Sequence, residues 1–247
     1  MIIIPNLFYS RLEPAVFRRR LHRFAAEVET GEGREVVHIP NSGRLRELLF
    51  PGNQVGLHLE GHQGRKTKYT LVSANTEGGW AFIDARLPNR ILSRFWRELP
   101  PLRLYEQAYP EKTWGKSRFD LALQSGGSSR TDEPLVSGGT LTTAWLEAKC
   151  VTLVQEGTGL FPDAPTERGR KHLQELIRLT KGGGKAFVFF FLQHPEGDRV
   201  QANGETDPEF AAVMTEAAKS GVSFYAYRVE PEDEKVTLTE VPVLTGD

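Results

Sequence analysis

Trp145-Leu146-Glu147-Ala148-Lys149-Cys150-Val151 is the stretch that decides the fold and its chemistry, because two opposite charges stand inside an otherwise apolar run. An apolar run of this length predicts a β-strand, in which residues two apart point to the same face, so Glu147 and Lys149 share a face. Burying a charge is costly unless the charge is paired or bound to a metal. The alternative is a solvent-facing Glu–Lys pair on an edge strand, and the motif alone does not exclude it.

A second strand-like run, residues 116–123, carries the lone carboxylate of Asp120 in apolar surroundings. If the two runs pair as a hairpin, Asp120 lies beside Glu147, and two adjacent carboxylates need a cation to neutralise them. Mg²⁺ or Mn²⁺ meets this need, with oxygen ligands and retained water. Lys149 on the same face is then placed to orient an attacking water or to stabilise charge on phosphorus. Asp120, Glu147 and Lys149 are therefore the candidate catalytic residues, and the first two are candidate metal ligands.

The remaining pattern of the second half predicts a mixed sheet covered by helices. Thr166 begins a helix that ends at Gly182-Gly183-Gly184, and the apolar run 185–192 predicts a strand buried on both faces. The other expected elements are strands at 119–123, 144–154 and 222–229, a Gly/Ser-rich mobile loop at 124–143, and a helix at 208–220.

The first half predicts a small β-barrel of the OB type, because short β-like runs alternate with Gly-rich turns. A helix should follow, capped by Asn89 and running to Leu99. The fold class is therefore α+β, with an OB-like barrel in residues 1–85 and a mixed-sheet domain in residues 86–247. The five expected barrel strands lie at 17–28, 35–39, 54–59, 67–73 and 80–83.

Composition fits a globular protein, with 39% hydrophobic and 26% charged residues. The single cysteine, Cys150, excludes an intrachain disulfide and a cysteine-built zinc site. No unbroken apolar run approaches about eighteen residues, so we expect a cytoplasmic protein without a membrane partner. The net charge of −1 conceals an asymmetry, because residues 1–98 hold 15 Lys/Arg and 10 Asp/Glu, whereas residues 99–247 hold 16 and 22. A basic binding module joined to an acidic one would explain this difference in charge between the two halves. Chance variation in composition would explain it equally well.

Two groups of basic residues are candidates for nucleic-acid binding. In the first half, cations alternate with aromatic residues, as in a groove that follows a nucleic-acid backbone. In the second half, cations fall in the first turns of the helix that begins at Thr166, where the helix dipole favours phosphate. The alternative is that these cations lie on ordinary solvent-exposed faces of strands and helices, which show the same pattern of basic residues. The candidates are Arg18, Arg20, Lys66, Lys68, Arg168, Lys171 and His172.

Several motifs together resemble the sugar fermentation stimulation protein A family, in order and across nearly the whole chain. The motifs are Pro40-Asn41-Ser42-Gly43-Arg44, Leu87-Pro88-Asn89-Arg90, Lys116-Ser117-Arg118-Phe119-Asp120, Leu146-Glu147-Ala148-Lys149 and the run from Gly159 to Leu173. The resemblance implies an OB-like domain followed by a domain like the restriction endonucleases of the PD-(D/E)xK superfamily. It also implies DNA binding linked to the regulation of sugar-utilisation genes. Carried onto this chain, it adds Glu106 as a further metal ligand and Arg44 as a DNA contact.

Two hypotheses follow from these residues. The first is a Mg²⁺- or Mn²⁺-dependent nuclease that uses Asp120, Glu147 and Lys149. The second is a non-catalytic DNA-binding regulator whose acidic site is vestigial or binds a structural metal. Both expect DNA as the partner, single- or double-stranded, and both leave the oligomeric state open, a homodimer included. A third possibility is that the acidic second half mainly contacts another protein.

Overall fold

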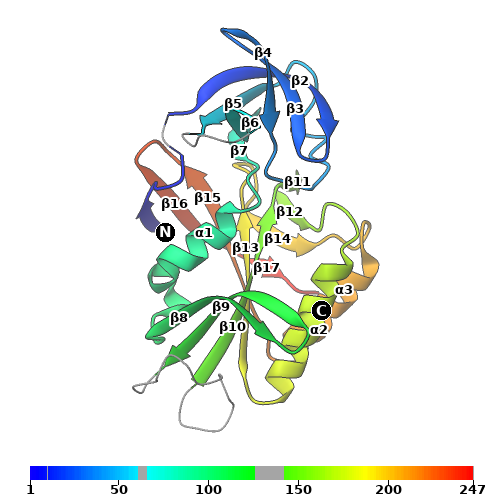
Figure 1. Cartoon of the computed structure of the whole chain (residues 1–247). Helices are drawn as coiled ribbons and strands as arrows, with labels where there is room; N and C mark the ends of the chain where they lie inside the picture. Colours follow the sequence, from blue (N-terminus) through cyan, green and yellow to red (C-terminus); the bar gives the residue numbers. More distant parts are fainter. Residues whose placement is uncertain (10, 61–65, 126–141, 247) are drawn as a thin grey trace.

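The computed structural model of the chain describes residues 1–9, 11–60, 66–125 and 142–246 (Figure 1). Within these residues the chain forms three β-sheets and three α-helices, with a small barrel standing on a larger α/β body. The α+β fold class that the sequence predicts is confirmed. Most of the loop expected at 124–143 lies outside the described residues.

The barrel is a six-stranded sheet in the order β4-β3-β2-β5-β6-β7, and an additional pairing between β4 and β6 closes it into a ring of five strands. Its interior is a separate apolar core that includes Phe17, Val37 and Leu71. The strands are β2 (Glu13–His22), β3 (Ala25–Thr30), β4 (Gly33–His38), β5 (Gln54–Leu59), β6 (Tyr69–Thr76) and β7 (Gly79–Phe82).

One expected strand, residues 17–28, is in fact two. β2 ends at His22, a tight turn occupies Arg23 and Phe24, and β3 begins at Ala25. His22 Nδ1 accepts a hydrogen bond from the Phe24 amide at 3.2 Å, which helps to close this turn. The prediction missed the turn because it has none of the Gly, Asn or Asp residues that usually mark a hairpin.

The large sheet has seven strands in the order β1-β16-β15-β13-β10-β9-β8, with a parallel centre and antiparallel edges. Alternate residues of β13 belong to different cores: Phe189 packs on one face and Phe190 on the other. This double burial explains the continuous apolar run, as the sequence predicts. The strands are β1 (Ile2–Pro5), β8 (Gln107–Trp114), β9 (Ser117–Ser125), β10 (Thr142–Val151), β13 (Lys185–Leu192), β15 (Ser223–Pro231) and β16 (Lys235–Val241).

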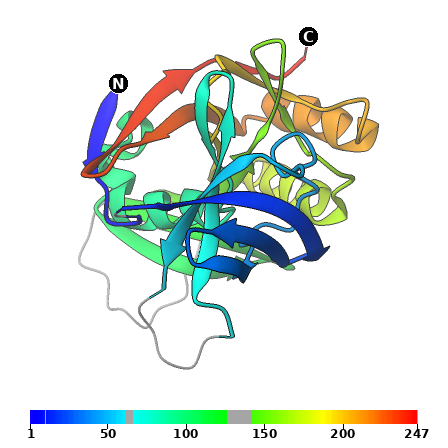
Figure 2. The ribbon, with the colours of Figure 1, turned by 90° about the horizontal axis from the view of Figure 1, so that it is seen from above.

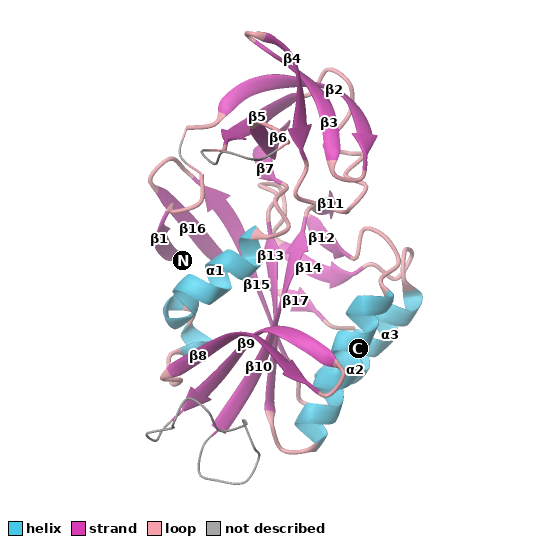
Figure 3. Ribbon diagram, in the orientation of Figure 1, coloured by secondary structure: helices cyan, strands magenta, loops and turns pink. Residues whose placement is uncertain are grey.

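Helices cover both faces of this sheet. Figure 3 shows α1 (Leu87–Phe95) on one side and α2 (Glu167–Lys181) with α3 (Pro208–Lys219) on the other. Two short 3-10 helices, at Trp96–Glu98 and Pro100–Leu102, follow α1. Because no described helix is long and apolar enough, none is a candidate to cross a membrane.

Helix boundaries agree with the sequence where a side-chain cap is present. The Thr166 side chain accepts a hydrogen bond from the Gly169 amide at 3.1 Å, so α2 begins where the sequence predicts. α1, however, begins at Leu87 with Pro88 in its first turn, which the fixed φ of proline favours. Asn89 therefore lies within the helix and does not cap it, so its side chain is available for hydrogen bonds outside α1.

Two features of the sheets were not predicted. β1 pairs with β16, so the first residues of the chain join the large sheet although the barrel follows them in sequence (Figure 2). The division of the chain at residue 85 stays a prediction. The third, four-stranded sheet was also not predicted and consists of β11 (Leu153–Gln155), β12 (Thr158–Phe161), β14 (Arg199–Ala202) and β17 (Val243–Leu244).

Candidate metal and phosphodiester site

The β9–β10 hairpin brings the two predicted carboxylates together. Leu121 of β9 lies opposite Leu146 of β10, so the next positions, Asp120 and Glu147, are neighbours where the antiparallel pairing ends. Leu146 packs on the α1 side of the sheet, and Glu147 on the opposite side contacts α2. The strand pairing thus places both acidic groups at the end of a hairpin, with Glu147 in contact with α2 and Asp120 in contact with α1.

Asp120 is held by both of its oxygens. The Asn89 side-chain amide donates to Oδ1 at 2.7 Å, and the main-chain amide of Ala148 donates to Oδ2 at 2.7 Å. Burial, and then the charge of Glu147, raise the pKa of Asp120 to about 6, although the hydrogen bonds act in the opposite direction. A nearby cation would relieve this unfavourable charge, as expected for a metal ligand.

Glu147 is the most constrained acid of the site, with only 4% of the residue exposed. Its Oε1 atom accepts hydrogen bonds from Lys149 Nζ and His172 Nδ1. Burial raises the pKa of Glu147, but Lys149 and His172 outweigh burial and hold that pKa below its ordinary value. Glu147 is therefore ionised and held in place by two partners.

The second oxygen of Glu147, Oε2, is buried and has no hydrogen-bond partner among the described residues. An unsatisfied buried acceptor costs about 1–3 kcal/mol, and more when it is charged. A divalent cation on this oxygen would remove the cost, so the donor set fits a hard metal ion. In the described part of the chain no three His, Cys, Asp or Glu side chains form a complete metal shell. Two carboxylates, with water and substrate phosphate, are the set that Mg²⁺ commonly accepts.

These groups open into a cavity of about 430 Å³ between the barrel and the large sheet. One wall comes from the barrel loop at Asn41, Ser42 and Gly43, and the other from residues 160–168 before and within the start of α2. The walls touch where the Arg44 amide donates to Asp163 Oδ2 at 3.1 Å. A side chain at position 43 would collide, because a Cβ atom there would lie 2.2 Å from the same oxygen. The barrel loop is therefore part of the site.

Comparison with known proteins identifies the family. A family model described as "Sugar fermentation stimulation protein RE domain" matches residues 86–235, and one described as "SfsA N-terminal OB domain" matches residues 19–83. The chain belongs to the sugar fermentation stimulation protein family. The resemblance noted in the sequence is thereby confirmed.

Relatives within the family align along almost their full length. The homolog from Alkaliphilus metalliredigens is 40% identical over 227 residues, which cover 91% of this chain and 92% of the relative. The homolog from Geobacter sulfurreducens is 36% identical over 251 residues, with full coverage of both chains. The structure of Pyrococcus furiosus SfsA, described as a complex with Ca²⁺, has 27% identity and a TM-score of 0.82, and covers 98% of this chain and 99% of that one.

Some of the predicted site residues of this family member lie elsewhere. The Glu106 amide donates to the carbonyl of Gln124, four residues along β9 from Asp120 and so about 13 Å away at the rise of a strand. The structure therefore corrects the expectation for Glu106, which does not reach Asp120 and Glu147. Glu111 instead lies directly across from Asp120 on β8, since Pro110 faces Leu121 and Lys112 faces Phe119.

The structure also corrects two of the nucleic-acid contacts. Arg20 donates to the main-chain carbonyls of Asn41, Gly43 and Arg44 at 2.7–3.0 Å, so its guanidinium holds the barrel loop in place. His172 is buried against Glu147 and is a hydrogen-bonding group, not an exposed phosphate contact. Both side chains therefore make hydrogen bonds to other groups of the protein.

The other basic candidates are exposed. Arg18 pairs with Glu29, and Lys68 pairs with Glu32 at 3.2 Å. Exposed pairs of this kind contribute only about 0–1 kcal/mol, so a phosphate can replace the carboxylate. Arg168 lines the cavity itself. Arg23 also lines it, although the sequence did not predict that Arg23 lies at this site. Within the described residues, the exposed candidates for which no ion pair is seen are Arg44, Lys66, Arg168 and Lys171.

Asn89 and Glu111 are the residues that sequence reasoning missed. Asn89 carried a signal, because Pro88 favours the first turn of a helix and so places Asn89 inside the helix and not at its cap. Its side chain donates to Asp120 and, at 3.4 Å, to Glu111 Oε1. Glu111 carried no signal, since its position depends on the register between β8 and β9.

Proposed function

We propose that this protein is a metal-dependent phosphodiesterase that cleaves DNA. The observation that carries the proposal is the buried, unpartnered Oε2 of Glu147 beside Asp120, with Lys149 on the same face. A cation-binding oxygen pair next to a lysine, at the wall of an open cavity, is the set that hydrolysis of a phosphodiester requires.

Asp120 and Glu147 are the residues that would hold Mg²⁺ or Mn²⁺. When bound, the ion supplies charge stabilisation at a phosphate oxygen and a more acidic water. Lys149 donates hydrogen bonds toward charge that develops on the phosphate, and His172 keeps Glu147 oriented. Asn89 does the same for Asp120 from α1. The complex of the related Pyrococcus protein with Ca²⁺, which also prefers oxygen ligands, supports a site of this kind.

DNA is the proposed substrate because positive charge gathers at the same cavity. Arg23 of the barrel and Arg168 of α2 line it from opposite walls, and the N-terminus of α2 adds a partial positive charge. The OB architecture of the barrel is often used for oligonucleotides. Regulation of sugar-utilisation genes is the biological role that the family resemblance implies, and DNA binding through this surface is our proposed basis for it.

A second candidate function is DNA binding without cleavage. Both oxygens of Asp120 already accept hydrogen bonds, and Lys149 Nζ is engaged with Glu147. Because these side chains already have hydrogen-bond partners, the site also suits a structural metal ion that stabilises the contact between the sheet and the barrel.

The test is cleavage of labelled single- and double-stranded DNA and RNA with Mg²⁺ or Mn²⁺, by the wild type beside Glu147→Ala. The proposal expects metal-dependent cleavage of DNA that is absent in the variant and in EDTA. Binding of DNA with no cleavage of any substrate would favour the second candidate. Equal cleavage by the variant would assign the activity to a contaminant and overturn the proposal.

Asn89→Ala should weaken metal affinity or activity by about 10–100-fold, as loss of a group that orients a metal ligand commonly does. Asp120 would keep the hydrogen bond from Ala148 but lose the one that fixes Oδ1. Ser93→Ala on the same helix is the matched control and should leave both quantities unchanged. A titration with Mn²⁺ checks this, and equal affinity in all three proteins would contradict the role of Asn89.

The variants Arg168→Gln and Lys171→Gln compare two contributions to DNA binding. Arg168 would contact a phosphate at the cavity, whereas Lys171 would contribute only general surface charge. If Arg168 contacts a phosphate, its loss reduces the slope of log K against log salt by about one, whereas Lys171, outside the cavity lining, should contribute less. DNA binding measured between low and moderate salt checks this. Identical slopes for both variants and the wild type would remove Arg168 from the binding surface.

A further inference from the structure

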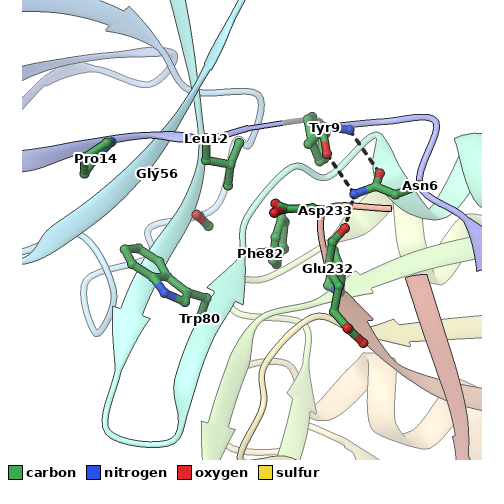
Figure 4. Close-up of a pocket in the computed structure, with 11 residues that line it drawn as sticks. Asn6, Tyr9, Leu12, Pro14, Gly56, Trp80, Phe82, Glu232 and Asp233 are labelled. Atoms are coloured by element: carbon green, nitrogen blue, oxygen red, sulfur yellow. Dashed lines mark hydrogen bonds between the residues drawn. The ribbon is translucent and has the colours of Figure 1, made fainter. Parts of the chain in front are cut away.

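A second cavity, of about 280 Å³, lies between the barrel and the β15–β16 hairpin. It is lined by different residues from those of the metal site, and Figure 4 shows that they come from the barrel, the segment before it and the hairpin tip. Its size lies just below the roughly 300–1,000 Å³ that is typical of small-molecule sites, and such sites favour domain interfaces. A small molecule fits this space, and a folded partner does not.

Aromatic rings form much of the wall. Tyr9 and Phe82 stack with ring centroids 6.1 Å apart, and Trp80 stands nearby with 44% of the residue exposed. The face of an indole ring carries negative electrostatic potential. This arrangement suits a ligand with an apolar or cationic body.

The polar lining is acidic. Glu232 and Asp233 come from the hairpin tip, and none of the described residues that line the cavity is Lys, Arg or His. Glu232 pairs with Lys235 at 3.3 Å, whereas Asp233 makes no ion pair within the described residues. A phosphate or carboxylate would be repelled here, so this cavity does not continue the proposed DNA surface.

The floor holds an unsatisfied polar group. Ser73 is 0% exposed, and its Oγ atom has no hydrogen-bond partner in the described part of the chain. Gly56 lies directly against this hydroxyl, because a Cβ atom there would lie 2.3 Å from it and 3.0 Å from Leu12 Cδ1. A buried hydroxyl without a partner is costly, and a ligand hydroxyl or amine reaching it would remove the cost.

We propose that this cavity binds a small organic cation, a substituted ammonium with an adjacent polar group. The charge lies against Trp80 and Asp233, and the polar group bonds to Ser73. Aromatic faces with a carboxylate and no competing cation are the chemistry that recognises ammonium groups. The inference is independent of the metal site and of DNA cleavage.

The test is calorimetric titration of the full chain with choline and with its neutral isostere 3,3-dimethylbutan-1-ol. Choline should bind saturably at roughly millimolar concentration or below, and the isostere much more weakly. Trp80→Ala and Asp233→Asn should each weaken choline binding about tenfold. Glu234→Gln removes the same charge from the same exposed hairpin, outside the lining, and should bind choline as the wild type does.

Ser73→Ala provides a further readout. Its melting temperature should equal or exceed that of the wild type, since the hydroxyl has no partner, while choline affinity falls. Equal binding of choline and its isostere, binding of neutral monosaccharides in preference to choline, or no saturation by choline would each overturn the proposal. So would wild-type affinity in both Trp80→Ala and Asp233→Asn.

Discussion

Lys149→Ala should lower DNA cleavage by about 10²–10³-fold, the usual cost of removing one donor that stabilises transition-state charge. Mn²⁺ binding should persist, because Asp120 and Glu147 remain and the ion itself neutralises the carboxylate that Lys149 leaves behind. Single-turnover cleavage together with a Mn²⁺ titration separates these two effects.

Lys171→Ala is the matched control for this prediction. It removes the same charge from an exposed position on α2 that does not line the cavity, so cleavage at saturating DNA should be unchanged. Cleavage by Lys149→Ala at the wild-type rate would show that the lysine serves only as the counter-charge of Glu147.

Phe190→Ala should lower the free energy of unfolding by about 3–5 kcal/mol. Phe190 is 1% exposed, and its ring lies between those of Phe161 and Phe224, at centroid distances of 5.7 and 6.3 Å. The cavity left behind would lie between the large sheet and the helices α2 and α3. Urea denaturation followed by circular dichroism measures the change.

Phe50→Ala removes the same side chain from a site where 48% of the residue is exposed. Its effect should remain within about 0.5 kcal/mol, because little apolar surface loses its contacts. A loss of stability in Phe190→Ala as small as in Phe50→Ala would contradict the two-faced burial of β13 and with it the layered architecture.

The sequence predicted the elements whose pattern is local. The alternation of short apolar runs with Gly-rich turns identified the barrel, and the run 185–192 identified the central strand of the large sheet. The cap at Thr166 fixed the start of α2 to the residue. In each case the deciding interactions lie within a few residues along the chain.

Long-range pairing is what the sequence did not show. β1 is only four residues long, and its partner β16 lies more than two hundred residues away, so no local pattern connects them. Some strands of the four-stranded sheet, such as β17 with two residues, are below the length at which alternation is visible. The Arg23–Phe24 turn has no residue type that marks a turn.

The residues of the candidate site also fall into those that a local sequence pattern predicted and those that depend on long-range contacts. Asp120, Glu147 and Lys149 were found because a charge in an apolar strand stands out. Asn89 and His172 reach the acids from two different helices, and an exposed and a buried helical position look alike in one sequence. Arg20 was assigned to DNA because its neighbours are basic, whereas the fold uses it to hold the barrel loop.

The most direct test of the proposed metal site is Mn²⁺ binding measured by electron paramagnetic resonance on the full chain. The wild type should bind one Mn²⁺ per chain, and Glu147→Gln should lose at least about tenfold in affinity, because the unpartnered carboxylate oxygen becomes part of an amide. Glu106→Gln is the matched control and should bind as the wild type does. Equal affinity in the wild type and Glu147→Gln, or loss of binding in Glu106→Gln alone, would contradict a metal centre at Asp120 and Glu147.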